Sequence, residues 1–403
     1  MRKTFISLRI DSISNFLFIF LIFSHVISIP IKAESSAAVD QKVKAEATRS
    51  QFRKTVEKSY LDAKKWFLNN IRDEGVFVYL YDPVNDRYAS ENNMVRQLMA
   101  SRLLAEITLE QPDLRSTHEK NLQFVFSRWY RESNDGYGYI FYDNLSKLGA
   151  NAMALRTLVY SPFFYDYADK AKNIARGIIS LMNDDGSFEP WFIAPAYQYN
   201  PDDILTSFPG EGILSLVEYA LKSEQDKYLM AAIRSQEFYL NKYIIHLEQN
   251  YYPAYVPWHT MALSKLYGLT NRDEYARAIF RFNDELLKLQ DTTDYIGRFH
   301  KPEYPHFGKP HSSADGIYTE SLAYALEIAK QKNAFLHQAS YESAIRLSLQ
   351  NLVSLQYTKE YSIVAKRKQK MEGAFRINAQ DQRIRIDCTQ QIVDAYRKIL
   401  QVF

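Results

Sequence analysis

The 403-residue chain contains one cysteine, Cys388, so it has no internal disulfide and no metal site built from several cysteines. It also lacks the spaced histidine pair of zinc hydrolases, the glycine-rich loop that holds phosphates, and the Gly-x-Ser-x-Gly turn of serine esterases. Two Asp-Asp pairs occur, at 184–185 and 202–203, without the second acidic cluster that magnesium-pyrophosphate chemistry needs. We therefore expect no metal and no cofactor, and chemistry carried by carboxylate, histidine, tyrosine and arginine side chains.

Neither sign of charge is in large excess, since 50 Lys and Arg stand against 47 Asp and Glu. No cluster of basic residues interleaved with aromatic residues occurs, so we expect no nucleic-acid partner. Aromatic residues are abundant by contrast, at 14% of the chain, with 30 Tyr and 24 Phe. Tyrosine lines many sites that bind polar ligands such as sugars, but a large helical core requires aromatic residues as well.

The N-terminus has the pattern of a targeting segment. Arg2, Lys3 and Arg9 precede the apolar stretch "FLFIFLIFSHVISIPI" (16–31), and Ala33 follows as a small residue suited to cleavage. The stretch has 16 residues, whereas a helix that spans a bilayer needs about 20. We predict a secretory signal over 1–33 and an exported protein, periplasmic or secreted. If the segment stays uncleaved, it is an N-terminal anchor and the membrane is a partner.

After the signal, 34–50 is small and polar and is expected to be a linker, and 51–403 shows no break long enough to divide it into domains. A turn that contains aspartate and glycine, followed by an aromatic residue, recurs along this domain. A spacing of about fifty-five residues predicts repeating helical hairpins, because one period holds two helices and their loops. The turns are centred on Gly75, Gly136, Gly186, Gly297 and Gly373.

Between these turns, apolar residues recur three and four positions apart, which predicts helices. Several of these segments are apolar or small on nearly all sides, as in helices that are packed on both faces. The sequence therefore predicts an all-α domain, an (α/α)6 toroid of six hairpins with an inner and an outer ring of helices. A solenoid of helical pairs is the competing architecture. The expected inner helices lie within 94–107, 151–160, 212–223, 260–269, 321–331 and 390–400.

Polar residues of catalytic type gather just before, or in the first turn of, each expected inner helix. In a toroid the inner helices run parallel, so their first turns meet at one rim, where the helix dipoles favour an anionic ligand. The expected catalytic residues are Glu211, Glu320, Asp387 and His259, and the expected substrate-binding residues are Asn93, Arg96, Trp258, Tyr318, Arg385 and Gln390.

Several of these residues also have a purely structural explanation. Acidic residues are favoured in the first turn of a helix by its dipole, which alone accounts for Glu211 and Glu320. His259, beside Trp258, is equally consistent with a hydrogen-bonded histidine of the core.

The C-terminal segment "RIRIDCTQQIVDAYRKIL" (383–400) allows two interpretations. Asp387 followed by Gln390 is a capping-box arrangement, in which the carboxylate accepts N–H bonds from the first turn and the glutamine reaches back. This explains Asp387 but not Arg383 and Arg385, which alternate with isoleucines in an extended approach to the helix. Two arginines there can bind a ligand carboxylate or pair with a neighbouring acid.

The segments "MVRQLMA", "FPGEGIL", "YTESLA" and "GAFRIN…RIRIDCTQQ" resemble those of α/α-toroid proteins, especially the six-hairpin glycosidase-like superfamily, over 51–403. The Asp-Gly-aromatic turns are also similar to those of terpenoid cyclases and prenyltransferases. The acidic motif of protonation-driven cyclases is missing, and so is the Asp/Cys/His zinc set of prenyltransferases, since Cys388 stands alone. The resemblance implies the toroid fold more strongly than it implies a particular reaction.

Three functions are consistent with these residues. In a glycoside hydrolase, Glu211 or Glu320 gives a proton to the leaving oxygen, and Asp387 or the other glutamate activates water. In a uronate-directed polysaccharide lyase or C5-epimerase, Tyr318 or His259 abstracts the proton beside a carboxylate that the rim arginines neutralise. In a non-catalytic glycan-binding or scaffold protein, the rim acids are tied up in ion pairs. We expect the hydrolase, with a glycan or oligosaccharide, neutral or anionic, as its ligand.

Overall fold

The computed structural model of the chain describes residues 36–200 and 204–403, so the expected signal segment, 1–33, lies outside the described residues. The chain divides after Ala47 into a smaller unit and a larger one, and the larger unit, Thr48–Phe403, is compact. The first described helix, α1 (Ser36–Asn69), begins in the smaller unit and ends in the larger one. The segment expected to be a linker, 34–50, is therefore helical from Ser36 onward. All further elements belong to the larger unit.

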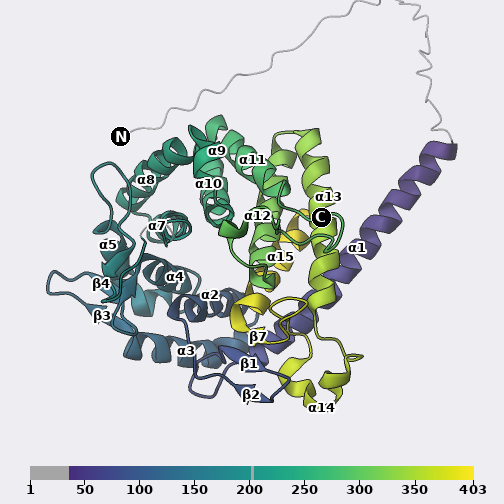
Figure 1. Ribbon diagram of the computed structural model, residues 1–403. Helices are drawn as coiled ribbons and strands as arrows, with labels where there is room; N and C mark the ends of the chain where they lie inside the picture. The colour runs from purple at the N-terminus through teal and green to yellow at the C-terminus, as the bar shows by residue number, and fades with distance from the viewer. Residues whose placement is uncertain (1–35, 201–203) are drawn as a thin grey trace, which may run out of the picture. The chain divides into compact units, whose positions relative to one another are not determined.

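Six helices form a closed inner ring in the larger unit (Figure 1). Each packs against the next inner helix along the chain, and the last packs against the first. This closure confirms the toroid and rules out the open solenoid. The ring is buried on nearly all sides, and every residue of Leu148–Val159 is buried. The inner helices are α2 (Met94–Glu110), α4 (Leu148–Val159), α7 (Phe208–Ser223), α10 (Val256–Thr270), α12 (Ser312–Gln331) and α15 (Ile386–Val402).

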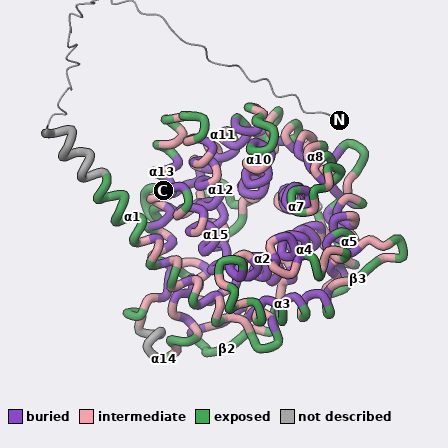
Figure 2. Tube along the Cα trace, turned by 180° about the vertical axis from the view of Figure 1, so that it is seen from behind, coloured by how far each residue is buried: buried purple, intermediate pink, exposed green. Residues whose placement is uncertain are grey.

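An outer ring of helices surrounds the inner one. Five outer helices each pack on the inner helix that precedes them in the chain. Figure 2 shows that the inner ring is almost continuously buried, whereas the outer helices have exposed faces. The part of α1 from Thr48 on is the sixth outer helix, and its Ser59 hydroxyl donates to the Gln356 side chain at 2.6 Å. The other outer helices are α3 (Arg115–Arg128), α5 (Ala168–Ile179), α8 (Asp226–Ile244), α11 (Asp273–Leu287) and α13 (Phe335–Leu355).

Short strands connect the rings. β1 (Leu80–Asp82) pairs antiparallel with β2 (Arg87–Tyr88) and with β7 (Ile384–Arg385), which brings the first connection of the ring next to the last. Two further antiparallel pairs are β3 (Tyr130–Glu132) with β4 (Gly138–Ile140), and β5 (Ser146–Lys147) with β6 (Trp191–Ile193). Shorter helical elements are α9 (Leu247–Asn250), α14 (Ser362–Met371) and the 3-10 turns Pro112–Leu114, Phe164–Tyr167, Pro253–Tyr255 and Pro305–Phe307.

The glycine turns found in the sequence join neighbouring hairpins. All five glycines have φ between 72° and 95°, a range that residues with a side chain rarely adopt. At Gly373 a Cβ atom would also clash with the carbonyl oxygen of Asp62 in α1, so this turn closes the ring only as glycine. In four of the turns, the aromatic residue two positions later is buried in the core: Phe77, Phe188, Phe299 and Phe375.

The abundance of aromatic residues is largely explained by the core. The largest fully buried side chains are mainly tyrosines and phenylalanines, for example Tyr228, Tyr275 and Phe282. Across 36–200 and 204–403, no helix combines the length and the apolar character needed to cross a membrane.

Candidate active site

A cavity of about 490 Å³ opens where the inner helices begin, a size typical of small-molecule sites. Every inner helix contributes a residue of its first turns, or the residue just before them, to the wall. The first-turn N–H groups of a helix lack internal partners and give its N-terminus a partial positive charge. The expected meeting of first turns at one rim is thus present in the structure. Six predicted site residues line this central cavity: Asn93, Arg96, Glu211, Trp258, Tyr318 and Asp387.

Glu211 is the buried acid of the central cavity. It lies in the first turn of α7, is 3% exposed, and has no hydrogen-bond partner at Oε2. Burial raises its pKa to about 8, and the positive charges of Arg156 and Lys147 oppose this only in part. Gly149 of α4 leaves room for the carboxyl group, because a Cβ atom there would clash with Oε2. Glu211 is therefore protonated at neutral pH and able to donate a proton to a ligand.

Asp387, in the first turn of α15, is a carboxylate that stays ionised. Arg385 donates to its Oδ2 from Nη2 at 2.8 Å, and Nε of Arg96 lies 2.9 Å from the same oxygen. Burial alone would raise its pKa, but the two guanidinium groups outweigh burial and lower the pKa to about 2. The capping-box interpretation is wrong, because no side chain caps this helix and Gln390 donates to Asp394 instead.

His311 precedes the first turn of α12 and also lines the central cavity. Its Nδ1 accepts a hydrogen bond from the backbone N–H of Ala314 at 3.0 Å, so the ring proton lies on Nε2. Burial lowers its pKa to about 4; the negative charge of Asp387 opposes this, and nearby guanidinium groups add to it. At neutral pH, His311 is thus an uncharged side chain with an N–H donor at Nε2.

Positive groups outnumber negative ones in the central cavity. Lys147 and Lys309 line it together with Arg96, whereas Asp387 is the ionised carboxylate among the described lining residues. The Tyr79 hydroxyl accepts a hydrogen bond from Nη1 of Arg96 at 2.8 Å and holds the guanidinium in place. Burial, together with the charge of Arg96, lowers the pKa of Lys147. Such a cavity favours a ligand with negative or strongly polar groups.

Aromatic and amide side chains complete the central cavity. Trp258 and Tyr318 contribute their rings from α10 and α12. Burial raises the pKa of Tyr318, so its hydroxyl is protonated at neutral pH. Asn93 caps α2, and its side-chain oxygen accepts the backbone N–H of Arg96 at 3.2 Å.

Glu320 does not lie at the expected rim. The helix α12 begins eight residues earlier, at Ser312, which places Glu320 about 12 Å along the axis from the helix start. It lines a different cavity, of about 90 Å³, with Arg102, Arg156 and Asp394. Burial, helped by the charge of Asp394, raises the pKa of Glu320 to about 8, although both arginines oppose it.

His259 points away from the central cavity, toward the outer helix α8. The Gln236 amide lies within 3.2 Å of its Nδ1, and the rings of Tyr239 and Tyr243 pack at centroid distances of 5.6 and 5.5 Å. Burial lowers its pKa to about 3 and keeps it neutral. His259 is therefore a hydrogen-bonded histidine of the core, the second of the two explanations that the sequence allows.

The remaining predicted residues are placed as follows. Gln390 is buried, does not line the central cavity, and donates a hydrogen bond to Asp394. Arg385 does not line the cavity either, but it donates a hydrogen bond to Asp387, which does. Arg383 pairs with Asp381, a partly exposed contact of 2.6 Å. Within 36–200 and 204–403, no group of three or more His, Cys, Asp or Glu is placed to hold a metal ion.

A closed ring of six helical hairpins, with a polar cavity at the N-termini of its inner helices, is the architecture of an (α/α)6 toroid. No protein-family model matches the chain, and none of the curated proteins matches its sequence.

Solved structures match the fold. D-mannose isomerase is 11% identical, with a TM-score of 0.66 over 87% of this chain and 99% of the other. The GH76 α-1,6-mannanase from Salegentibacter sp. HEL1_6 is 10% identical, with a TM-score of 0.61 over 87% and 100% of the two chains. A type II terpene cyclase from Scytonema is 13% identical, with a TM-score of 0.56 over 88% and 100%. At these identities the likeness shows the fold alone.

Proposed function

We propose that the protein is a carbohydrate-active enzyme of the glycoside-hydrolase type, which acts on a glycan bound in the central cavity. The proposal rests on two carboxyl groups in one cavity whose pKa values are shifted in opposite directions. Burial holds Glu211 in its acid form, with a pKa of about 8, and two arginines hold Asp387 ionised, with a pKa of about 2. Glycosidases that cleave with two carboxyl groups require this division, a proton donor and an anion beside one glycosidic bond.

In the proposed reaction, Glu211 gives its proton to the glycosidic oxygen as the bond from that oxygen to the anomeric carbon breaks. Positive charge develops on the sugar ring, and the carboxylate of Asp387 stabilises it. Water then bonds to the anomeric carbon and returns a proton to Glu211, which restores the starting state. With a pKa of about 2, Asp387 is a weak base, so we assign it the electrostatic role rather than the activation of water.

The other lining groups suit a sugar. Trp258 and Tyr318 offer flat apolar surfaces for a pyranose ring. Arg96, Lys147 and Nε2 of His311 offer donors for hydroxyl or carboxylate oxygens. The cavity thus offers both aromatic rings and polar groups. This combination matches a sugar, whose ring faces are apolar and whose hydroxyl groups are polar.

The solved structures with this fold support a sugar as ligand. One is named for D-mannose, and an inactive form of the mannanase, with two successive aspartates replaced, was solved with α-1,6-mannotriose. In the present chain, the pair 184–185 lies in a glycine turn with Asp185 exposed, and 202–203 lies outside the described residues. Mannose and manno-oligosaccharides are therefore the first ligands to test, and the acid is assigned to Glu211 on its own geometry.

The second candidate function is a uronate-directed lyase or C5-epimerase. The positive excess of Arg96, Lys147 and Lys309 supports it, because a uronate carboxylate must be neutralised before its neighbouring proton is removed. Tyr318 is then the group that exchanges the proton.

One set of assays separates these functions. The purified protein is incubated with manno-oligosaccharides and with oligogalacturonides, and reducing ends, ultraviolet absorbance of unsaturated sugars and proton NMR spectra are followed. We expect new reducing ends without ultraviolet absorbance, as hydrolysis requires. Absorbance from the uronates favours the lyase, and a changed NMR spectrum without chain cleavage favours the epimerase. If none of these signals appears with either series, the enzyme assignment fails for both sugar classes.

We also propose that the protein is exported, on the basis of the basic and apolar pattern of residues 1–33. N-terminal sequencing of the protein purified from its own cells should then begin near residue 34. A protein that keeps Met1 and stays with the membrane indicates an anchor, and one that keeps Met1 in the cytoplasm contradicts export.

A further inference from the structure

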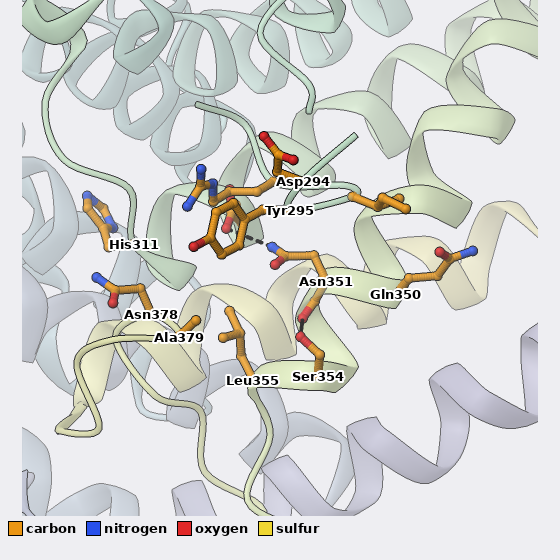
Figure 3. A pocket seen from close by; sticks show the side chains of 12 residues that line it. Asp294, Tyr295, His311, Gln350, Asn351, Ser354, Leu355, Asn378 and Ala379 are labelled. Carbon is orange, nitrogen blue, oxygen red and sulfur yellow. Dashed lines mark hydrogen bonds between the residues drawn. The ribbon is translucent and has the colours of Figure 1, made fainter. Parts of the chain in front are cut away.

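A second cavity adjoins the central one at the same rim. It measures about 290 Å³ and is formed by the connection between α11 and α12, the end of α13 and the loop before β7. Among the described residues, His311 is the one that lines both cavities. Figure 3 shows His311 and Asn378 on one side of this side cavity, Asn351 on the other, and Tyr295 between them. The proposed reaction uses only the central cavity, so the side cavity has no assigned role.

Arg298 gives the side cavity a donor group that is held in place and incompletely used. Its Nε is buried without a hydrogen-bond partner, and its Nη2 lies 4.0 Å from the Asp291 carboxylate. That carboxylate already accepts backbone N–H bonds from residues 293–295. The guanidinium rests on the Tyr295 ring, 3.9 Å from its centroid, which fixes its plane. Arg298 can therefore donate to a ligand without breaking a strong internal contact.

Amide and carboxyl groups supply the complementary acceptors. Asp315 accepts the backbone N–H of Phe299 at 2.9 Å and the side-chain amide of Asn351 at 2.8 Å. The second bond fixes the orientation of the Asn351 amide at the wall of the side cavity (Figure 3). Asp294 lines the same space as a further acceptor. Donors and acceptors that stand side by side match hydroxyl groups, because each hydroxyl both donates and accepts.

We propose that the side cavity is a second sugar subsite, so that the substrate is an oligosaccharide whose chain passes His311 from one cavity into the other. This rests on the proposed function and deepens it. The volume is at the lower end of the range for ligand sites and fits one sugar unit rather than a large aglycone. Arg298 lines the side cavity together with two carboxyl groups, Asp294 and Asp315, so the lining does not favour an anionic unit and a neutral sugar fits it.

The test measures how affinity depends on chain length. Isothermal titration of the full-length Glu211→Gln protein uses D-mannose, α-1,6-mannobiose and α-1,6-mannotriose as probes. We expect the longer probes to bind at least about tenfold more tightly than mannose. Arg298→Gln should remove this gain and leave the Kd of mannose unchanged. The matched control is Arg277→Gln, the same substitution at an exposed position of α11 outside both cavities, which should keep the gain.

A second variant fills the side cavity instead of removing a partner. Ala379 lines it from an exposed loop, so Ala379→Trp should fold and should also abolish the gain. The subsite is refuted if either variant keeps the full gain, or if all three probes bind equally. If length has no effect while Glu211-dependent turnover is present, the subsite fails and the proposed function stands. If no probe binds and no glycan is turned over, both are overturned.

Discussion

Replacing Glu211 by glutamine is expected to lower turnover of the glycan substrate by roughly 10²–10⁴-fold, the contribution that a general acid typically makes. Glutamine has nearly the same size and fits the space beside Gly149, but it carries no acidic proton. The fold should therefore persist. Initial rates with the substrate identified by the oligosaccharide assays measure the effect, and circular dichroism spectra verify the fold.

Glu320→Gln is the matched control for this experiment. Glu320 is also buried with a pKa of about 8, but it lines the 90 Å³ cavity rather than the central one. Turnover by Glu320→Gln should equal that of the unmodified protein. A large loss in this variant with none in Glu211→Gln would move the active centre to the other end of the ring. No loss in either variant contradicts catalysis by a buried glutamic acid and favours a glycan-binding protein.

The pH profile gives the Glu211 experiment a second readout. Only the protonated form donates, so the rate should fall as the pH rises through about 8. The same shift affects stability: since the pKa is raised on folding, from 4.5, the stabilising contribution is complete below pH 4.5 and is lost as the pH rises through about 8. Glu211→Gln should therefore be less sensitive to alkaline unfolding than the unmodified protein.

The fold was predictable because its two determinants are local. Four connections between hairpins contain a glycine with positive φ followed two positions later by a buried aromatic residue, as in the turns Gly75–Phe77 and Gly373–Phe375. The inner helices are rich in apolar and small residues because other helices cover them on both sides, and every residue of α4 is buried. The contact between the last turn and α1, which closes the ring, is not marked by any local pattern. It could be expected only because the sequence predicts six hairpins.

The site was predictable only in part, because helical periodicity does not fix where a helix begins or which way a side chain points. Glu320 was placed at the rim on the assumption that α12 begins several residues later than Ser312. His259 lies on a helix that is buried on both faces, and the pattern does not distinguish the cavity from the outer ring. His311 was missed because histidine is not among the usual capping residues. Lys309 comes from a long connection without periodicity.

The structure also bears on the scaffold hypothesis, in which the rim acids are neutralised by ion pairs. Asp387 fits that description, since Arg96 and Arg385 both contact it. Glu211 does not fit, because one of its oxygens has no partner and its neighbours leave the pKa raised. A site kept only for structure would favour an apolar residue at this position, since burying an unpaired carboxyl group opposes folding.

Asp387→Asn should separate a catalytic anion from a structural ion pair by affecting both activity and stability. We expect turnover to fall by roughly 10²-fold or more, because the developing positive charge loses its counter-charge. The pKa of Asp387 is lowered on folding from 3.8 to about 2, which corresponds to about 2 kcal/mol of folding free energy at neutral pH. Denaturant unfolding at pH 7 should show a loss of that order, since the variant leaves two arginines without their partner.

The pH dependence of the stability loss in Asp387→Asn tests whether the ionised carboxylate causes it. A pKa lowered on folding contributes stability that is complete above the unfolded value, near 3.8, and is lost as the pH falls through about 2. The difference between Asp387→Asn and the unmodified protein should therefore be largest near neutral pH and vanish near pH 2. Arg383→Gln, which removes only the partly exposed pair with Asp381, is the control and should leave turnover unchanged. If Asp387→Asn loses stability but keeps full turnover, Asp387 serves only to hold the arginines, and the two-carboxylate mechanism is wrong.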